Sequence, residues 1–263
     1  VSGINLNFSC PGYKVIPQRR GGELLQDPGM IYQIIEKTLK YAELPVSIKI
    51  RKGYTANQNP NQLCKNIAKE FGKNITWISI NRAPVRMGGV DMRQVEDDIV
   101  PFQQATESVD GQIPIIANGA IDSLSKLELI SQNTKVNGIM LGRPALGNQG
   151  IFQEFDNFLC KKPNLIQDEN SMLFKNINQL FDTIKSYHKT SQGMWTTIGH
   201  LKKLLFWYLK KNYEKQGLQL PAGYGFTSWT KKQHTIESFI QSLSKGFPQI
   251  SADNWKKWLE YLF

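Results

Sequence analysis

The sequence predicts an α/β fold with a parallel sheet in its first part and helices alone in its second part. Between Gly3 and about Phe158, short apolar runs of strand type alternate with stretches of helical length, which is the pattern of parallel βα units. After Pro163 the strand-type runs disappear, and the change falls in the polar segment CKKPNLIQDENS. We therefore expect two domains, residues 1–163 and residues 164–263.

Five strands are expected in the first domain, each followed by a helix. The expected strands are Ile4–Asn7, Val46–Ile50, Ile75–Ile80, Ile113–Ala117 and Val136–Leu141. The expected helices are Asp27–Tyr41 after Pro28, Asn61–Phe71, one around Val95–Glu107, Ser123–Ser131, and short helices from Pro144. Runs such as IPIIA and NGIML indicate strands that are covered on both faces. The second domain is expected to contain helices at Met172–Tyr187, Trp195–Glu214, His234–Ser244 and Asn254–Phe263.

Composition limits the class of protein. The chain has 263 residues and is 40% hydrophobic, so it can bury a full core, and no apolar run reaches the ~18 residues of a membrane span. Cys10, Cys64 and Cys160 form no CxxC pair, which favours a reducing compartment. The net charge of +10 is typical of a protein that binds a polyanion such as nucleic acid. A basic surface that is only solvated would give the same net charge. The first residue is Val, so we expect any targeting segment to lie outside this sequence.

Small-residue turns follow the last two expected strands. These turns, Asn118-Gly119 and Gly142-Arg143, each open onto a helix. At this place βα barrels commonly bind a phosphate through backbone N–H groups and a helix N-terminus. Glycine lets the backbone approach the anion, and Arg143 can add charge-assisted hydrogen bonds. Either dipeptide alone is also an ordinary turn.

Two cations share one face of the second strand, because Lys49 and Arg51 alternate with isoleucines. A solvated edge strand would show the same pattern. A central parallel strand has no side facing water, so cations there need an anion or a cofactor. Cys10 lies on a Pro/Gly turn after the first strand, and taken alone it is either a small buried hydrophobic residue or a reactive thiol.

Several segments resemble one known family. INLNFSCPGYKVIPQRRGGELLQDP resembles the signature of the tRNA-dihydrouridine synthases, in which an asparagine and Cys-Pro follow a strand, with Lys-Val, Gly and Leu-Leu further on. VSIKIRKGY resembles the next strand of that family, IPIIANGAI its asparagine-glycine strand, and GIMLGRPALGNQGIF its last strand and helix. HLKKLLFWYLKK resembles its helical domain. The resemblance covers nearly the whole chain.

The resemblance implies an FMN-dependent enzyme that reduces uridine in tRNA to 5,6-dihydrouridine, with NADPH as reductant. It implies a (β/α)8 TIM-type barrel with five strands present here, followed by a helical domain that binds tRNA. The first three strands are expected from upstream residues or from another chain. By the same resemblance Cys10, in its protonated form, supplies the proton that accompanies the hydride.

Further roles follow from the resemblance. Asn7 is expected to hold the uracil edge of the substrate or the flavin, and Arg51 to bind the substrate or the flavin. Lys49 is expected to face the polar edge of the flavin. Further cofactor contacts are expected from Asn81, Asn118, Gly119, Ala120, Gly142 and Arg143. Substrate contacts in the second domain are expected from Lys203, Trp207 and Lys210, which share a helix face; a core stripe with solvated lysines would give the same spacing. The histidines have no metal-ligand spacing, so we expect no metal site.

The chain departs from the family's pattern at two positions. Many members have a histidine where this chain has Asn81 or Ile80, and the acidic residue that usually follows asparagine-glycine is Ala120. These departures favour a second hypothesis, a catalytically inactive scaffold subunit of a larger, for example mitochondrial, assembly. The expected compartment is the cytoplasm or the mitochondrion.

Overall fold

The computed structural model describes residues 1–88, 95, 97–145, 148, 150–162, 179, 241, 244 and 251–260. The chain divides into two compact units, residues 1–142 and residues 143–263. Helix α6 (Ile151–Leu159) belongs to the second unit, although the sequence analysis groups it with the strands. A functional division at residue 163 stays a prediction.

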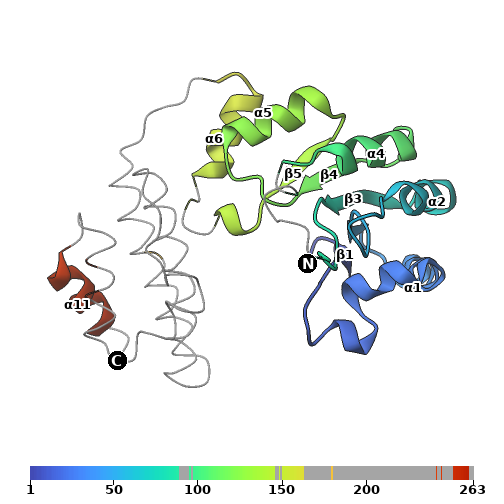
Figure 1. Ribbon diagram of the computed structural model, residues 1–263, viewed down its shortest axis with the longest axis horizontal. Coiled ribbons are helices and arrows are strands. Elements are labelled where there is room, and N and C mark those ends of the chain that lie inside the picture. Colours follow the sequence, from blue (N-terminus) through green and yellow to red (C-terminus); the bar gives the residue numbers. More distant parts are fainter. Residues whose placement is uncertain are drawn as a thin grey trace. The chain divides into compact units, whose positions relative to one another are not determined.

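The first unit is built on a five-stranded sheet in which each strand pairs with the next one along the chain (Figure 1). The strands are β1 (Ile4–Phe8), β2 (Val46–Arg51), β3 (Ile75–Asn81), β4 (Ile115–Asn118) and β5 (Gly138–Met140). All four pairings are parallel. Consecutive parallel pairing is the strand order of a βα barrel, so the predicted α/β class is confirmed.

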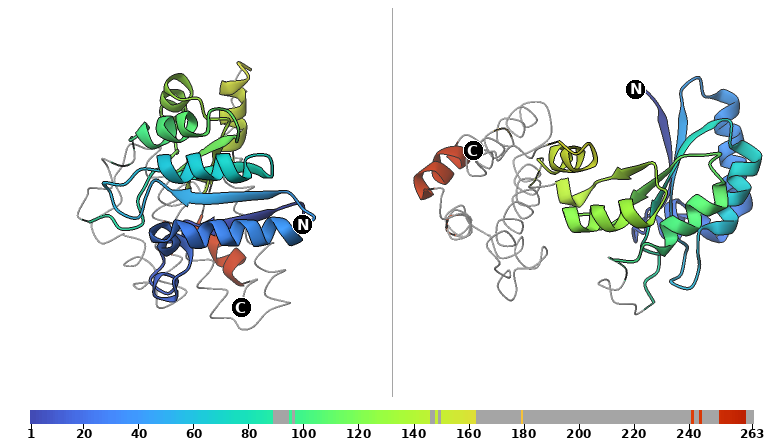
Figure 2. Two further views of the ribbon diagram at one scale, coloured as in Figure 1. Left: turned by 90° about the vertical axis from the view of Figure 1, so that its right-hand side faces the viewer. Right: turned by 90° about the horizontal axis from the view of Figure 1, so that it is seen from above.

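A helix follows each of the first four strands. The helices are α1 (Pro28–Tyr41), α2 (Asn61–Phe71), α4 (Val100–Val109) and α5 (Leu124–Asn133). Figure 2 shows α1, α2 and α4 along one face of the sheet. The Asp27 side chain accepts a hydrogen bond from the Met30 N–H at 3.1 Å and so caps α1. Helix α4 begins at Val100, later than expected, because Pro101 occupies its first turn.

The two faces of the sheet differ in polarity. The helix-covered face carries fully buried isoleucines, whereas the other face carries polar side chains in register. Asn7 pairs with Lys49 and Lys49 with Ser79. One step further on, Arg51 is level with Asn81 and Asn118. Strands β1 to β3 therefore alternate in polarity, as the spacing of Lys49 and Arg51 predicts for β2.

The second unit is described in part. It contains the 3-10 helix η3 (Arg143–Ala145), α6 and α11 (Ala252–Glu260). Helix α11 covers most of the helix expected at 254–263. The helices expected at 172–187, 195–214 and 234–244 lie outside the described residues, so an all-helical second domain stays a prediction. No helix in the described part of the chain is long and apolar enough to cross a membrane.

Candidate active site

Asn118, at the end of β4, is the centre of a hydrogen-bonded cluster on the polar face of the sheet. Its side-chain Oδ1 accepts hydrogen bonds from Lys49 Nζ at 2.6 Å and from Asn81 Nδ2 at 2.9 Å. Its Nδ2 donates to the backbone carbonyl of Met140 at 2.8 Å. One nearly buried amide thus connects β2, β3, β4 and β5. The structure brings together three residues that the sequence analysis assigns to cofactor binding.

Lys49 is a partly buried cation. Burial, together with the nearby charge of Arg51, lowers the pKa of the Lys49 ammonium to about 8. Among the residues that the structure describes, no carboxylate lies within ion-pair distance of Lys49. An ammonium has three N–H donors, and its acceptor here is a neutral amide. This arrangement suits an anionic or electron-rich ligand.

The turn that carries Cys10 is shaped by Asn7. The Asn7 Oδ1 accepts hydrogen bonds from the backbone N–H groups of Ser9 at 3.0 Å and Cys10 at 3.2 Å. The Cys10 carbonyl accepts from the Gly22 N–H at 2.9 Å, at the start of the 3-10 helix η2 (Gly21–Gln26). Cys10 itself is a free, partly exposed thiol. Asn7 therefore holds the backbone that leads into the predicted acid, a role that the sequence analysis missed.

Arg51 connects two loops at the carboxyl ends of the strands. Its Nε donates to the Ser9 carbonyl at 2.8 Å, and its guanidinium also donates to the Pro84 carbonyl at 2.8 Å and the Ala83 carbonyl at 3.3 Å. Hydrogen bonds from a charged donor are among the stronger ones in proteins. Arg51 therefore braces the Cys10 loop against the loop after β3, whereas a contact with substrate stays a prediction.

The two predicted phosphate turns differ in their backbone. Gly119 has a φ of 109°, and a Cβ there would lie 3.0 Å from Asn81 Oδ1. Ala120 follows with a φ of 48°. At Gly142 the backbone is not left-handed, and an added Cβ would meet no atom of the described residues within 4 Å. Only the turn at Gly119 therefore has a left-handed backbone angle, and phosphate binding by either turn stays a prediction; Arg143 begins η3 in the second unit.

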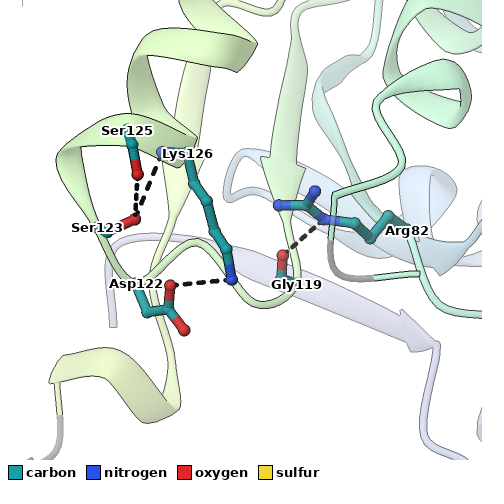
Figure 3. Close-up of polar contacts among 6 residues, drawn as sticks. All are labelled: Arg82, Gly119, Asp122, Ser123, Ser125 and Lys126. Carbon is teal, nitrogen blue, oxygen red and sulfur yellow. Dashed lines mark hydrogen bonds and ion pairs between the residues drawn. The ribbon is translucent and has the colours of Figure 1, made fainter. Parts of the chain in front are cut away.

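Arg82 is a buried residue of this region that the sequence analysis missed. It follows β3 directly, is 1% exposed, and its Nε donates to the Gly119 carbonyl at 2.8 Å (Figure 3). The sequence signal that could have indicated it is a charged residue at the end of an apolar strand, next to Asn81.

Lys203, Trp207 and Lys210 lie outside the described residues. No group of three or more His, Cys, Asp or Glu side chains that could hold a metal occurs in the described part.

The strand order and the polar cluster define an α/β protein of βα-barrel type with a ligand site at the carboxyl ends of its strands. The family model described as dihydrouridine synthase (Dus) matches residues 1–239, which is most of the chain. The chain belongs to the dihydrouridine synthase family.

Individual relatives agree with the family model. The chain is 26% identical over 220 residues to tRNA-dihydrouridine synthase B of Shewanella oneidensis, covering 81% of this chain and 62% of that protein. It is 29% identical over 215 residues to the protein of the same name from Vibrio parahaemolyticus, covering 80% and 61%. It is 30% identical over 208 residues to that of Pasteurella multocida, covering 79% and 59%. The chain thus spans about three fifths of the length of these relatives.

Proposed function

We propose that the protein containing this chain reduces uridine to 5,6-dihydrouridine in tRNA, with FMN as cofactor and NADPH as reductant. The observation that carries the proposal is the Lys49–Asn118 pair, in which a partly buried cation contacts a neutral amide at the carboxyl ends of the strands. Family membership and the names of the relatives support the same reaction and substrate.

The described residues fit a flavin mononucleotide in two respects. Lys49 would hold the polar edge of the flavin ring, because a desolvated ammonium stabilises negative charge there. The turn of Asn118, Gly119 and Ala120 would hold the phosphate, because exposed backbone N–H groups bind anions. Phosphate contacts from Gly142 and Arg143 stay a prediction from the sequence. FMN, when bound, supplies the hydride for the uracil double bond.

The proton that completes the reduction is assigned to Cys10. Saturating the 5,6 double bond adds one hydride at one carbon and one proton at the other, so the thiol has to be protonated when it acts. Asn7 fixes the Cys10 turn through its Oδ1, which leaves its amide Nδ2 to donate to a uracil oxygen. Arg51 holds the neighbouring Ser9 carbonyl, and this limits the movement of the thiol.

The remaining parts of the proposal concern segments outside the described site. Lys203, Trp207 and Lys210 would contact tRNA through phosphates and a stacked base, and the target base would be flipped out to reach the site. Further strands, from the same protein or another chain, would pair with the outer edges of β1 and β5. The proposed compartment is a reducing one, cytoplasmic or mitochondrial.

The test is the flavin content of the natural protein, followed by its activity. Visible absorbance after gel filtration gives flavin per chain, and dihydrouridine formation is then measured on tRNA that lacks the modification. Bound FMN and product formation support the proposal. Absence of bound flavin after FMN has been supplied would refute the proposal and would favour the alternative hypothesis of an inactive scaffold subunit.

A further inference from the structure

Arg82 holds two successive carbonyl groups at the end of β4. Its backbone N–H donates to the Asn118 carbonyl at 3.1 Å, and its side-chain Nε donates to the Gly119 carbonyl at 2.8 Å. The guanidinium lies over the Phe102 ring of α4, 5.3 Å from the ring centroid, and Phe102 is fully buried. The side chain of Arg82 is therefore fixed between a helix and the turn after β4.

The turn that Arg82 contacts is conformationally strained. Gly119 and Ala120 both have left-handed φ angles, 109° and 48°, and such an angle costs a residue with a Cβ roughly 1 kcal/mol or more. Strained backbone of this kind persists only where its surroundings determine it, and it is common at ligand sites. The hydrogen bond from Arg82 Nε to the Gly119 carbonyl is a contact that holds this turn.

The far end of the turn is held at the start of α5. The Ser123 Oγ accepts from the Lys126 N–H at 3.4 Å, and Lys126 and Asp122 form an ion pair of 3.1 Å (Figure 3). Exposed pairs of this kind contribute little. Arg82, which is buried, is the stronger restraint on the turn.

Anchoring the Gly119 carbonyl also fixes the direction of the next N–H group. The peptide between Gly119 and Ala120 is planar and trans, so its N–H points opposite to the carbonyl that Arg82 binds. Among the described residues, no group accepts a hydrogen bond from the Ala120 N–H. A charged donor on the carbonyl also polarises the peptide, which strengthens its N–H as a donor.

We infer that Arg82 is a positioning residue for phosphate recognition: by holding the Gly119 carbonyl it orients the Ala120 N–H toward a bound phosphate. This inference rests on the proposed function, because FMN is the ligand that carries the phosphate. Arg82 acts through the turn, and its own buried side chain makes no contact with the ligand.

The test compares FMN with riboflavin, which lacks the phosphate, by flavin fluorescence quenching in the natural protein. Arg82→Met should weaken FMN binding by about tenfold or more, the value of a hydrogen bond from a charged group. Riboflavin binding should stay within about twofold. Arg86→Met is the matched control, since it removes the same charge from an exposed position on the same loop, and it should leave both affinities unchanged.

Two further variants separate positioning from charge and from folding. Gly119→Ala should lose the preference for FMN over riboflavin, as Arg82→Met does. Phe102→Leu should weaken FMN binding by about two- to fivefold, because the Arg82 guanidinium loses the aromatic ring beneath it. If Arg82→Met fails to fold, the FMN and riboflavin affinities of Gly119→Ala and Phe102→Leu decide whether the inference holds. Equal losses for FMN and riboflavin, or a loss in Arg82→Met alone with the other two unchanged, would overturn the inference. Wild-type protein that binds FMN without preferring it to riboflavin would overturn it while leaving the proposed reaction intact, whereas wild-type protein without any flavin affinity would overturn both.

Discussion

Replacing Lys49 by methionine should stabilise the flavin-free protein while removing its flavin affinity. The pKa of Lys49 falls from its ordinary value of 10.5 to about 8 because burial and Arg51 disfavour the charge. This lowering of the pKa corresponds to a destabilisation of the folded protein by roughly 3 kcal/mol, as an upper estimate. Methionine keeps the length of the side chain, and the Asn118 Oδ1 keeps its hydrogen bond from Asn81. The variant should therefore unfold at a higher urea concentration at pH 7.

The pH dependence of this effect has a definite sign. Because the pKa of Lys49 is lower in the folded than in the unfolded state, the unfolded chain binds more protons between about pH 8 and 10.5. The destabilisation by Lys49 is complete below pH 8 and disappears as the pH rises to 10.5. The difference in free energy of unfolding between Lys49→Met and wild type should therefore shrink between pH 7 and pH 9.5.

The assay is urea denaturation of the apoprotein at both pH values, with Lys65→Met as control. Lys65 is exposed on α2, and its replacement should change stability by no more than about 0.5 kcal/mol at either pH. A Lys49→Met protein that is less stable than wild type at pH 7, or a difference that is the same at pH 7 and 9.5, would show that burial does not disfavour this charge.

Four other outcomes are expected from the same site. Flavin affinity of the wild-type protein should fall as the pH rises above about 8, where free Lys49 loses its charge; a flat profile would contradict this in a titration by fluorescence. Cys10→Ala should keep its flavin and lose dihydrouridine formation by about 10²–10⁴-fold in single-turnover assays, and near-normal turnover would assign the proton to another group. Asn118→Leu should lower the free energy of unfolding by about 2–4 kcal/mol, because the bonds to three elements are lost; a change below about 1 kcal/mol would argue against the cluster. Gly119→Ala should destabilise by about 1–2 kcal/mol, whereas Gly142→Ala should stay within about 0.5 kcal/mol, and equal effects would contradict the difference between the two turns.

The elements of the first unit could be predicted because their signals are local. Helix α2 has the bounds that its spacing predicts, 61–71. The alternation of Lys49 and Arg51 with isoleucines correctly places both on one face of β2. The start of α4 was placed too early, since the position of Pro101 in the first turn has more influence than the apolar pattern before it.

Hydrogen-bond partners of the site could not be predicted because they depend on strand register. Lys49 and Asn118 are 69 residues apart, and Arg51 reaches the Ser9 carbonyl across 42 residues. A one-residue change of register would turn either side chain to the other face, so only the folded sheet determines which groups meet. The left-handed φ angle at Ala120 could not be predicted from the sequence either, since alanine rarely adopts this angle.

The departures from the family's pattern do not leave the site incomplete. Asn81 donates to the Asn118 amide and accepts from the Ala83 N–H at 3.0 Å, so a neutral residue at this position satisfies its neighbours without a histidine. What the described residues leave uncompensated is the charge of Lys49, whose burial opposes folding below pH 8. A scaffold that binds no ligand gains nothing in return for this destabilisation. A flavin or another electron-rich ligand beside Lys49 would offset it, and for this reason Lys49, more than the cysteine that gives the family its signature, separates the enzyme from the scaffold.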